Sequence, residues 1–298
     1  MMFHYFFNMV FLIIIPLHLY IGFRLWQTLS FYYPKLSRVY YWLAFIVLSS
    51  TFIITRFTGD ILPTILNDTL STFGYTWIVA MLYMFFVLVI FDIISLGIKL
   101  AGIRLRPRTK HQTRMIAIIV VIMVILYGGW NARTPRITHY DITIPKYAAD
   151  INQLKVVVIS DLHLGRVIGN TRLREMLEKV NELEPDLVLI PGDIIQDSQY
   201  FDEEKMYLEF QKLNPPLGIF ASLGNHEFYG GVIKDTVGFL EQGGLKVLKD
   251  SYTKIANSFY IIGKDDPAAG RRGTANRPNL NMIMGGIPMV DRCFLPIF

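Results

Sequence analysis

The chain has 298 residues, 52% of them hydrophobic and 18% charged, and a mean hydropathy of +0.38. This is too apolar for an ordinary soluble protein, so part of the chain is expected to lie in lipid. The net charge of +5 is uneven: residues 1–149 hold 13 basic and 4 acidic side chains, whereas residues 150–298 hold 16 and 20. The basic excess belongs to the apolar half, and the composition therefore indicates no nucleic-acid partner.

Four apolar runs in the first half predict membrane-spanning helices. They cover residues 5–23, 39–55, 75–98 and 115–130. Each approaches the roughly 20 residues that a spanning helix needs, although the shorter runs also fit a buried core helix. The first run lacks the basic start and small-residue cleavage site of a secretory signal peptide. We therefore expect a transmembrane four-helix bundle over residues 1–135.

Basic residues between the runs predict the orientation of this bundle. The first and third loops carry most of them: Arg24, Lys35 and Arg38, then Lys99, Arg104, Arg106, Arg108, Lys110 and Arg114. Lys and Arg are retained on the cytoplasmic side of a membrane. We therefore expect an integral membrane protein, with the domain after Trp130 outside the cytoplasm.

The second half alternates apolar strands with helical patterns. Strands are expected at residues 154–160, 186–191, 218–223, 245–248 and 259–263, and helices at 171–183, 203–213 and 233–242, with Asn170 as a helix cap. A further edge strand is expected over residues 136–144, where side chains alternate between two prolines. The turn-rich residues 265–278 predict a surface loop with solvated arginines. The pattern indicates an α/β domain over residues 136–298, with a sheet covered on both faces.

Three polar motifs follow three of these strands. They are Asp161-Leu162-His163, Gly192-Asp193 and Gly224-Asn225-His226-Glu227. Functional groups of open α/β sheets collect beyond the carboxyl ends of the strands, so the motif side chains are expected to meet. Carboxylate, amide and imidazole donors suit Mn, Fe, Zn or Mg. Two such ions can activate a water molecule for attack on a phosphate ester. Because Cys293 is the single cysteine, an internal disulfide and a cysteine-based zinc site are excluded.

Each motif alone also has an ordinary structural explanation. Gly-Asp after a strand is usually a capped turn, and an Asn after a strand often begins a helix. The intervals from Asp161 to Asp193 and from Asp193 to Asn225 are both 32 residues, one strand-helix-strand step each. This order and spacing favour a common site.

Taken together, the three motifs resemble the first three signature blocks of the calcineurin-like metallophosphoesterase superfamily. The segment from Tyr127 to Arg133, after a membrane-spanning N-terminus, resembles its bacterial membrane-attached subgroup. The resemblance covers about residues 137–298 and implies an αββα sandwich. It also implies a dinuclear metal centre in which Asp161 and His163 bind one divalent ion, Asp193 bridges both and Asn225 binds the second. His226 would then protonate the leaving group or steady the phosphate, in hydrolysis of phosphomonoesters or phosphodiesters.

The family pattern continues with a His after a later strand and then Gly-His-x-His, and this chain departs from it. Its histidines are His4, His18, His111, His139, His163 and His226. We therefore expect a C-terminally truncated member whose metal binding and activity are impaired. A fold shared across many phosphoesters does not specify the substrate, and the membrane tether favours a lipid or envelope-derived ester.

Alternatives remain open at this stage. The domain could be a non-catalytic phosphate binder with a degenerate site, or the bundle could transport a solute, since Asp92 and His18 lie within apolar runs. Glu227 could orient His226 or be a solvated turn residue. Arg166 could contact a substrate phosphate or lie in an exposed loop.

Overall fold

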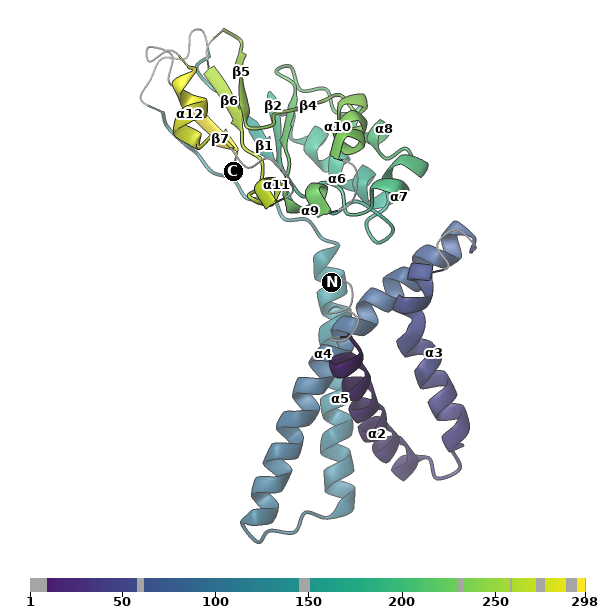
Figure 1. The fold of residues 1–298 in the computed structure, drawn as a ribbon. Coiled ribbons are helices and arrows are strands. Elements are labelled where there is room, and N and C mark those ends of the chain that lie inside the picture. The colour runs from purple at the N-terminus through teal and green to yellow at the C-terminus, as the bar shows by residue number, and fades with distance from the viewer. Residues whose placement is uncertain are drawn as a thin grey trace. The chain divides into compact units, whose positions relative to one another are not determined.

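The computed structural model describes residues 10–57, 62–144, 151–229, 233–257, 259–271, 277–287 and 294–297. The chain divides into two compact units, Met1–Ile137 and Thr138–Phe298 (Figure 1). The first consists of long helices and the second is a mixed α/β domain.

The N-terminal unit contains four long apolar helices. They are α2 (Ile15–Tyr32), which a π-helical turn η1 (Val10–Ile14) precedes, α3 (Arg38–Phe57), α4 (Thr64–Leu100) and α5 (Pro107–Ala132). All four are long and apolar enough to cross a membrane, which confirms the predicted number. The first predicted span begins at Tyr5, outside the described residues.

The helix ends differ from the predicted ones. Helix α2 continues past Phe23 to Tyr32, and α4 begins at Thr64 instead of residue 75. Charged and polar side chains end an apolar run, but they are good helix formers and do not end a helix. Many apolar side chains on these helices face outward, such as Ile93 and Leu126, both 64% exposed. Such a surface suits lipid, where a helix satisfies its own backbone hydrogen bonds.

The C-terminal unit is built on a parallel sheet of four strands in sequential order. These are β1 (Val156–Val158), β2 (Leu187–Pro191), β3 (Ile219–Ser222) and β4 (Leu245–Val247). Helix α6 (Asn170–Glu182) follows β1, and α10 (Ile233–Gln242) precedes β4. Successive strand residues face opposite sides. Val188 and Ile190 of β2 therefore pack in the core with the helices, while Leu187 and Leu189 pack in a second core.

A second sheet covers the other face. It contains β5 (Ser251–Ile255), β6 (Phe259–Gly263) and β7 (Phe294–Ile297), in that order. Phe259 and Ile261 share the core with the first sheet, whereas Tyr260 and Ile262 pack with residues around α12 (Leu280–Gly285). Helices, two sheets and a helix thus form successive layers (Figure 1), which confirms the αββα sandwich.

Three predicted elements differ in the structure. The edge strand expected at residues 136–144 does not form, and this stretch is exposed and irregular. The helix expected at 203–213 is replaced by α7 (Ser198–Glu203) and α8 (Tyr207–Phe210), because Lys205 between them has a left-handed φ of 49°. Asn170 is the first residue of α6 and not its cap, and its Nδ2 donates to the carbonyl oxygen of Glu204 at 2.9 Å.

The prediction of a surface loop after β6 is also partly wrong. Asp265 and Ala268 are buried, and α11 (Ala268–Arg271) begins there. Arg277 is paired instead of solvated: its Nε and Nη2 donate to the two carboxylate oxygens of Asp250, each at 2.8 Å. Burial would raise the pKa of Asp250, but the hydrogen bonds and charge of Arg277 outweigh it and hold this pKa below its usual value. Arg277 and Asp250 are 27 residues apart in the sequence, so no local sequence pattern predicts their ion pair.

Candidate metal centre

The loops after β1, β2 and β3 leave the parallel sheet at the same edge. Hydrogen bonds continue between the first two loops beyond the strands: the amide of His163 donates to the carbonyl oxygen of Asp193 at 3.0 Å, and that of Leu164 to Ile194 at 2.8 Å. The loops therefore run side by side, and the motif residues on them are held at fixed spacing.

Three predicted ligand residues have an unusual backbone conformation. Asp161, His163 and Asp193 have φ values of 56°, 47° and 51°, in the left-handed region. This region is disfavoured for L-residues, although Asp and His visit it more than most. Such conformations persist only where the surroundings enforce them, and they cluster at functional sites.

The imidazole of His163 lies between the two carboxylates. Its Nε2 is 3.9 Å from Oδ1 of Asp161 and 4.0 Å from Oδ2 of Asp193. These distances are too long for hydrogen bonds. On the other side of the ring, Nδ1 is 3.1 Å from Oε1 of Gln196. This contact holds the ring so that Nε2, the other ring nitrogen, faces the two carboxylates.

The residues after β3 approach the carboxylate of Asp193. Asn225 and His226 begin the short helix α9 (Asn225–Tyr229), and the amide of His226 donates to Oδ1 of Asp193 at 3.0 Å. With the amide of Asn225 oriented so that its nitrogen donates, this nitrogen is 2.9 and 3.0 Å from the oxygens of Asp193. The rings of His226 and His163 lie edge to face, with centroids 4.5 Å apart.

Two glycines allow the loop after β2 and the loop after β3 to approach each other closely. Gly192 has a φ of +81°, and a Cβ on it would meet the backbone nitrogen of Gly224 at 2.6 Å. A Cβ on Gly224 would collide with the carboxylate and backbone nitrogen of Asp193. These two positions therefore require glycine for the contact between the loops.

Glu227 has a role that neither sequence interpretation anticipated. Glu227 is only 2% exposed. Its two carboxylate oxygens accept hydrogen bonds from four backbone amides at 2.7–3.0 Å. These amides belong to Asp193, Ile194, Ile195 and Gly224. The side chain is thus buried instead of solvated, and it ties the loop after β2 to the loop after β3.

Arg166 is directed to a neighbouring helix. Its Nε is 3.8 Å from Oδ2 of Asp197, and its guanidinium lies over the ring of Tyr200 at 5.0 Å from the centroid. Asp197 caps α7 by accepting the amide of Tyr200 at 3.1 Å. Arg166 therefore packs against the start of α7, and the side chain is only 19% exposed.

The donor set fits a divalent cation. Ligand atoms of His163, Asp193 and His226 all lie within 4.8 Å of one another. Carboxylate, amide and imidazole donors bind Mn, Fe, Zn and Mg. The side chain of Asp193 is 17% exposed and that of Asp161 is 68% exposed, so the site has an enclosed side and a side open to solvent. The structure thus brings all five predicted site residues to one edge of the sheet, with Asp161 at its rim. Gln196 and Glu227 support them.

Comparison with known proteins shows a related family. Residues 154–283 match the family model described as calcineurin-like phosphoesterase. A zebrafish (Danio rerio) transmembrane protein with metallophosphoesterase domain is 30% identical over 147 residues, which are 49% of this chain and 33% of the relative. An uncharacterized metallophosphoesterase of Aquifex aeolicus is 32% identical over 160 residues, 51% of this chain and 59% of the relative.

A third relative carries a more specific name. The UDP-2,3-diacylglucosamine pyrophosphatase of Chlamydia trachomatis is 28% identical over 156 residues, which are 51% of this chain and 47% of the relative. The matches to these three relatives span between a third and three fifths of the relatives' own length. No solved structure matches the chain. The family match covers the strands and loops that carry all three motifs, and the C-terminal unit belongs to the calcineurin-like metallophosphoesterase superfamily.

Proposed function

We propose that the C-terminal unit hydrolyses phosphate esters with divalent metal ions held by Asp161, His163, Asp193 and Asn225. The observation that carries this proposal is the position of His163, whose Nε2 lies within 4.0 Å of carboxylate oxygens from two different loops. Two carboxylates that converge on one imidazole repel each other, and a cation held among them would offset that repulsion. Two ions bridged by Asp193 agree with its central place among these donors.

The ions would supply Lewis-acid polarisation of the phosphoryl group and a hydroxide nucleophile at neutral pH. The residues supply position. Gln196 orients the ring of His163, and Glu227 fixes the backbone that carries Asp193. The ring of His226, edge to face with His163, would give a proton to the leaving-group oxygen or hold the phosphate.

We further propose that the substrate is a lipid-linked or envelope-derived phosphate ester met outside the cytoplasm. Four helices able to cross a membrane precede the domain in the same chain, and their basic first and third loops favour an extracytoplasmic C-terminal unit. The Chlamydia relative is named for a pyrophosphatase that acts on a diacylglucosamine nucleotide, which is a lipid precursor bearing phosphate.

Hydrolysis of p-nitrophenyl phosphate and bis(p-nitrophenyl) phosphate by the purified full chain, supplied with Mn²⁺, tests the proposal. Asp193→Asn should lower kcat/KM on the order of 100-fold or more, because it removes the charge between the two loops. Asp202→Asn, exposed on α7, should leave the rate unchanged. Activity in Asp193→Asn equal to that of Asp202→Asn would refute the mechanism.

A non-catalytic phosphate-binding domain is the second candidate. The small number of histidine ligands favours this candidate. Residues 150–298 of this sequence contain two histidines, His163 and His226. Elemental analysis of the purified chain separates the two. Near two divalent metals per chain with ester turnover supports the enzyme, whereas phosphate binding with neither metal nor turnover supports the binder.

A further inference from the structure

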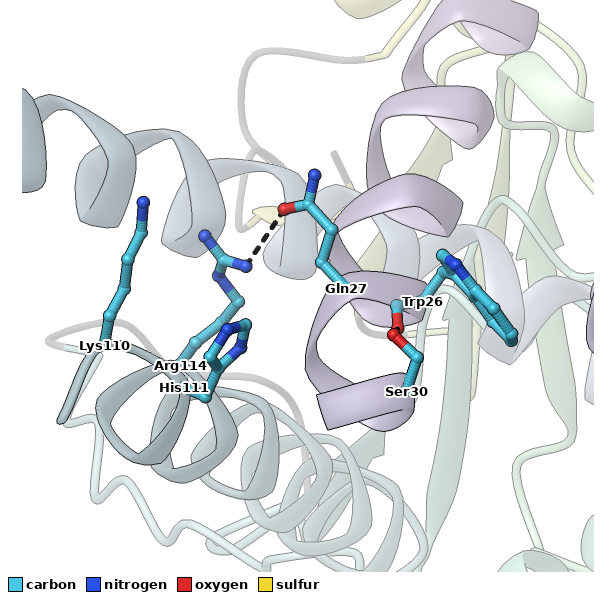
Figure 2. A pocket seen from close by; sticks show the side chains of 6 residues that line it. All are labelled: Trp26, Gln27, Ser30, Lys110, His111 and Arg114. Atoms are coloured by element: carbon cyan, nitrogen blue, oxygen red, sulfur yellow. Dashed lines mark hydrogen bonds between the residues drawn. The ribbon is translucent and has the colours of Figure 1, made fainter. Parts of the chain in front are cut away.

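The helical unit contains a cavity between α2 and α5 (Figure 2). It measures about 310 Å³. Its walls are formed by Trp26, Gln27 and Ser30 from α2, and by Lys110, His111 and Arg114 from the first two turns of α5. Three of the six side chains are thus basic, and the mechanism proposed for the C-terminal unit uses none of them.

Positive charge exceeds negative charge around this cavity. The side chain of Arg114 is 1% exposed, and its Nη2 lies 3.4 Å from Oδ1 of Asp92 on α4. Asp92 is shared, because Nη2 of Arg24 is 2.6 Å from its other oxygen. Among the described residues of the helical unit, the other carboxylate is that of Asp68, 24 residues earlier on the same helix and so roughly 36 Å away. One carboxylate therefore faces two guanidinium groups, and Lys110 adds a further charge.

Two side-chain nitrogens at the wall lack hydrogen-bond partners among the described residues. Nε of Arg114 and Nδ1 of His111 are buried and have no hydrogen-bond partner among the described residues. Nη1 of Arg114 reaches Oε1 of Gln27 at 3.3 Å, which is a long bond. The ring of His111 is held by stacking on Phe31, with centroids 4.3 Å apart and planes 13° apart. A buried guanidinium with an unsatisfied nitrogen is costly, and an anion in the adjoining cavity would balance its charge.

The cavity lies where the headgroups of a bilayer are expected. Helix α5 has 26 residues, more than the roughly 20 that span the hydrocarbon, so its first turns can reach the polar region. The positive end of its dipole is at this same terminus, beside Lys110. Trp26 is a residue type that favours the boundary between lipid and water. Basic pockets between membrane helices on the cytoplasmic side bind anionic headgroups.

We propose that this cavity binds a phosphate anion, with Arg114 and Lys110 as its charge partners and the rings of Trp26 and His111 as its walls. The phosphate can come from the headgroup of an anionic lipid or from the free ion. This site is independent of the metal centre, because its residues lie on other elements and in the other unit.

Native mass spectrometry of the full chain, titrated with phosphatidylglycerol against phosphatidylcholine, tests the lipid source. The wild-type chain should retain phosphatidylglycerol preferentially. Lys110→Gln should weaken this retention about fivefold, from the roughly 1 kcal/mol that one basic residue contributes near an anionic headgroup. Arg108→Gln removes the same charge two residues earlier, from an exposed position that does not line the cavity, and should change retention less than twofold.

Calorimetric titration of inorganic phosphate into the chain in phosphatidylcholine nanodiscs tests the free ion. A binding component that Lys110→Gln weakens and Arg108→Gln keeps assigns the site to free phosphate. Equal weakening by the two variants in both experiments would mean non-specific surface charge and overturn the proposal. So would the absence of any preference for phosphatidylglycerol together with the absence of phosphate binding. Arg114→Lys, which keeps the ion pair with Asp92 but removes the planar donor, should lower affinity without unfolding the chain.

Discussion

The carboxylate of Glu227 holds the main chain of Asp193. Its Oε2 accepts hydrogen bonds from the amide of Asp193 at 3.0 Å and from that of Gly224 at 2.8 Å. Its Oε1 accepts from the amides of Ile194 and Ile195 at 2.7 and 2.8 Å. One buried charge therefore joins the loop after β2 to the loop after β3. The left-handed backbone at Asp193, with a φ of 51°, is kept by these bonds.

Replacing Glu227 by Gln should destabilise the C-terminal unit by about 3 kcal/mol, since an amide cannot accept from four buried donors and brings donors of its own. The measurement is hydrogen exchange of the β2 and β3 amides across a urea series, on the full chain. Glu241→Gln, exposed on α10, is the control and should leave exchange unchanged. Indistinguishable exchange in the two variants would contradict the bracing role.

Gln196→Leu should lower the affinity for Mn²⁺ about 10- to 100-fold, a typical loss when the partner of a ligating histidine is removed. The leucine would leave Nδ1 of His163 without its hydrogen-bond partner, so the ring would no longer be held in place. Calorimetric titration of the full chain measures this affinity. Gln199→Leu, which loses only a contact to Glu203 on α7, provides the comparison. Unchanged affinity in Gln196→Leu would show that His163 is held by other means.

Gly224→Ala should lower phosphoesterase activity on the order of 100-fold, the usual effect of moving a reacting group by about 1 Å. The added Cβ would occupy the space of the Asp193 carboxylate, which must shift. Gly238→Ala, on α10 with open space around its Cα, should keep full activity. The rates of the two variants on p-nitrophenyl phosphate decide the matter, and equal rates would show that the loops can separate without loss.

Asp265→Asn should stabilise the chain relative to wild type at pH 7 but not at pH 4. Burial, with the nearby charge of Asp250, raises the pKa of Asp265 from 3.8 to about 6. A raised pKa in the folded state gives stability that is complete below about pH 4 and is lost as the pH rises through 6. Asparagine stays neutral throughout and avoids this loss.

The pH experiment compares hydrogen exchange of β6 in the two proteins at each pH, so that intrinsic exchange rates cancel. Asp250 has a lowered pKa and loses its contribution as the pH falls, but it is present in both proteins and also cancels. A difference between variant and wild type that stays constant from pH 4 to pH 7 would refute the assignment to Asp265.

Patterns carried by neighbouring residues predicted much of the architecture. Strand β6 and helix α10 were predicted with the bounds that the structure has, because apolar alternation and helical periodicity are local properties. Polar residues after three strands predicted where the site lies, since parallel strands end at one edge of the sheet. Strand β5 was missed, because its side chains alternate between intermediate and exposed positions until Ile255.

The amino-acid order thus predicted four apolar helices and an α/β domain and, through the family resemblance, the αββα class and the five residues expected at the metal centre. Only the tertiary structure decided which side chains pair to hold these elements and residues in place. Glu227 with Asp193, Gln196 with His163, Arg277 with Asp250 and Arg24 and Arg114 with Asp92 are pairs between 22 and 68 residues apart. Such partners are selected by packing in three dimensions, which brings together donors and acceptors that no periodic pattern links.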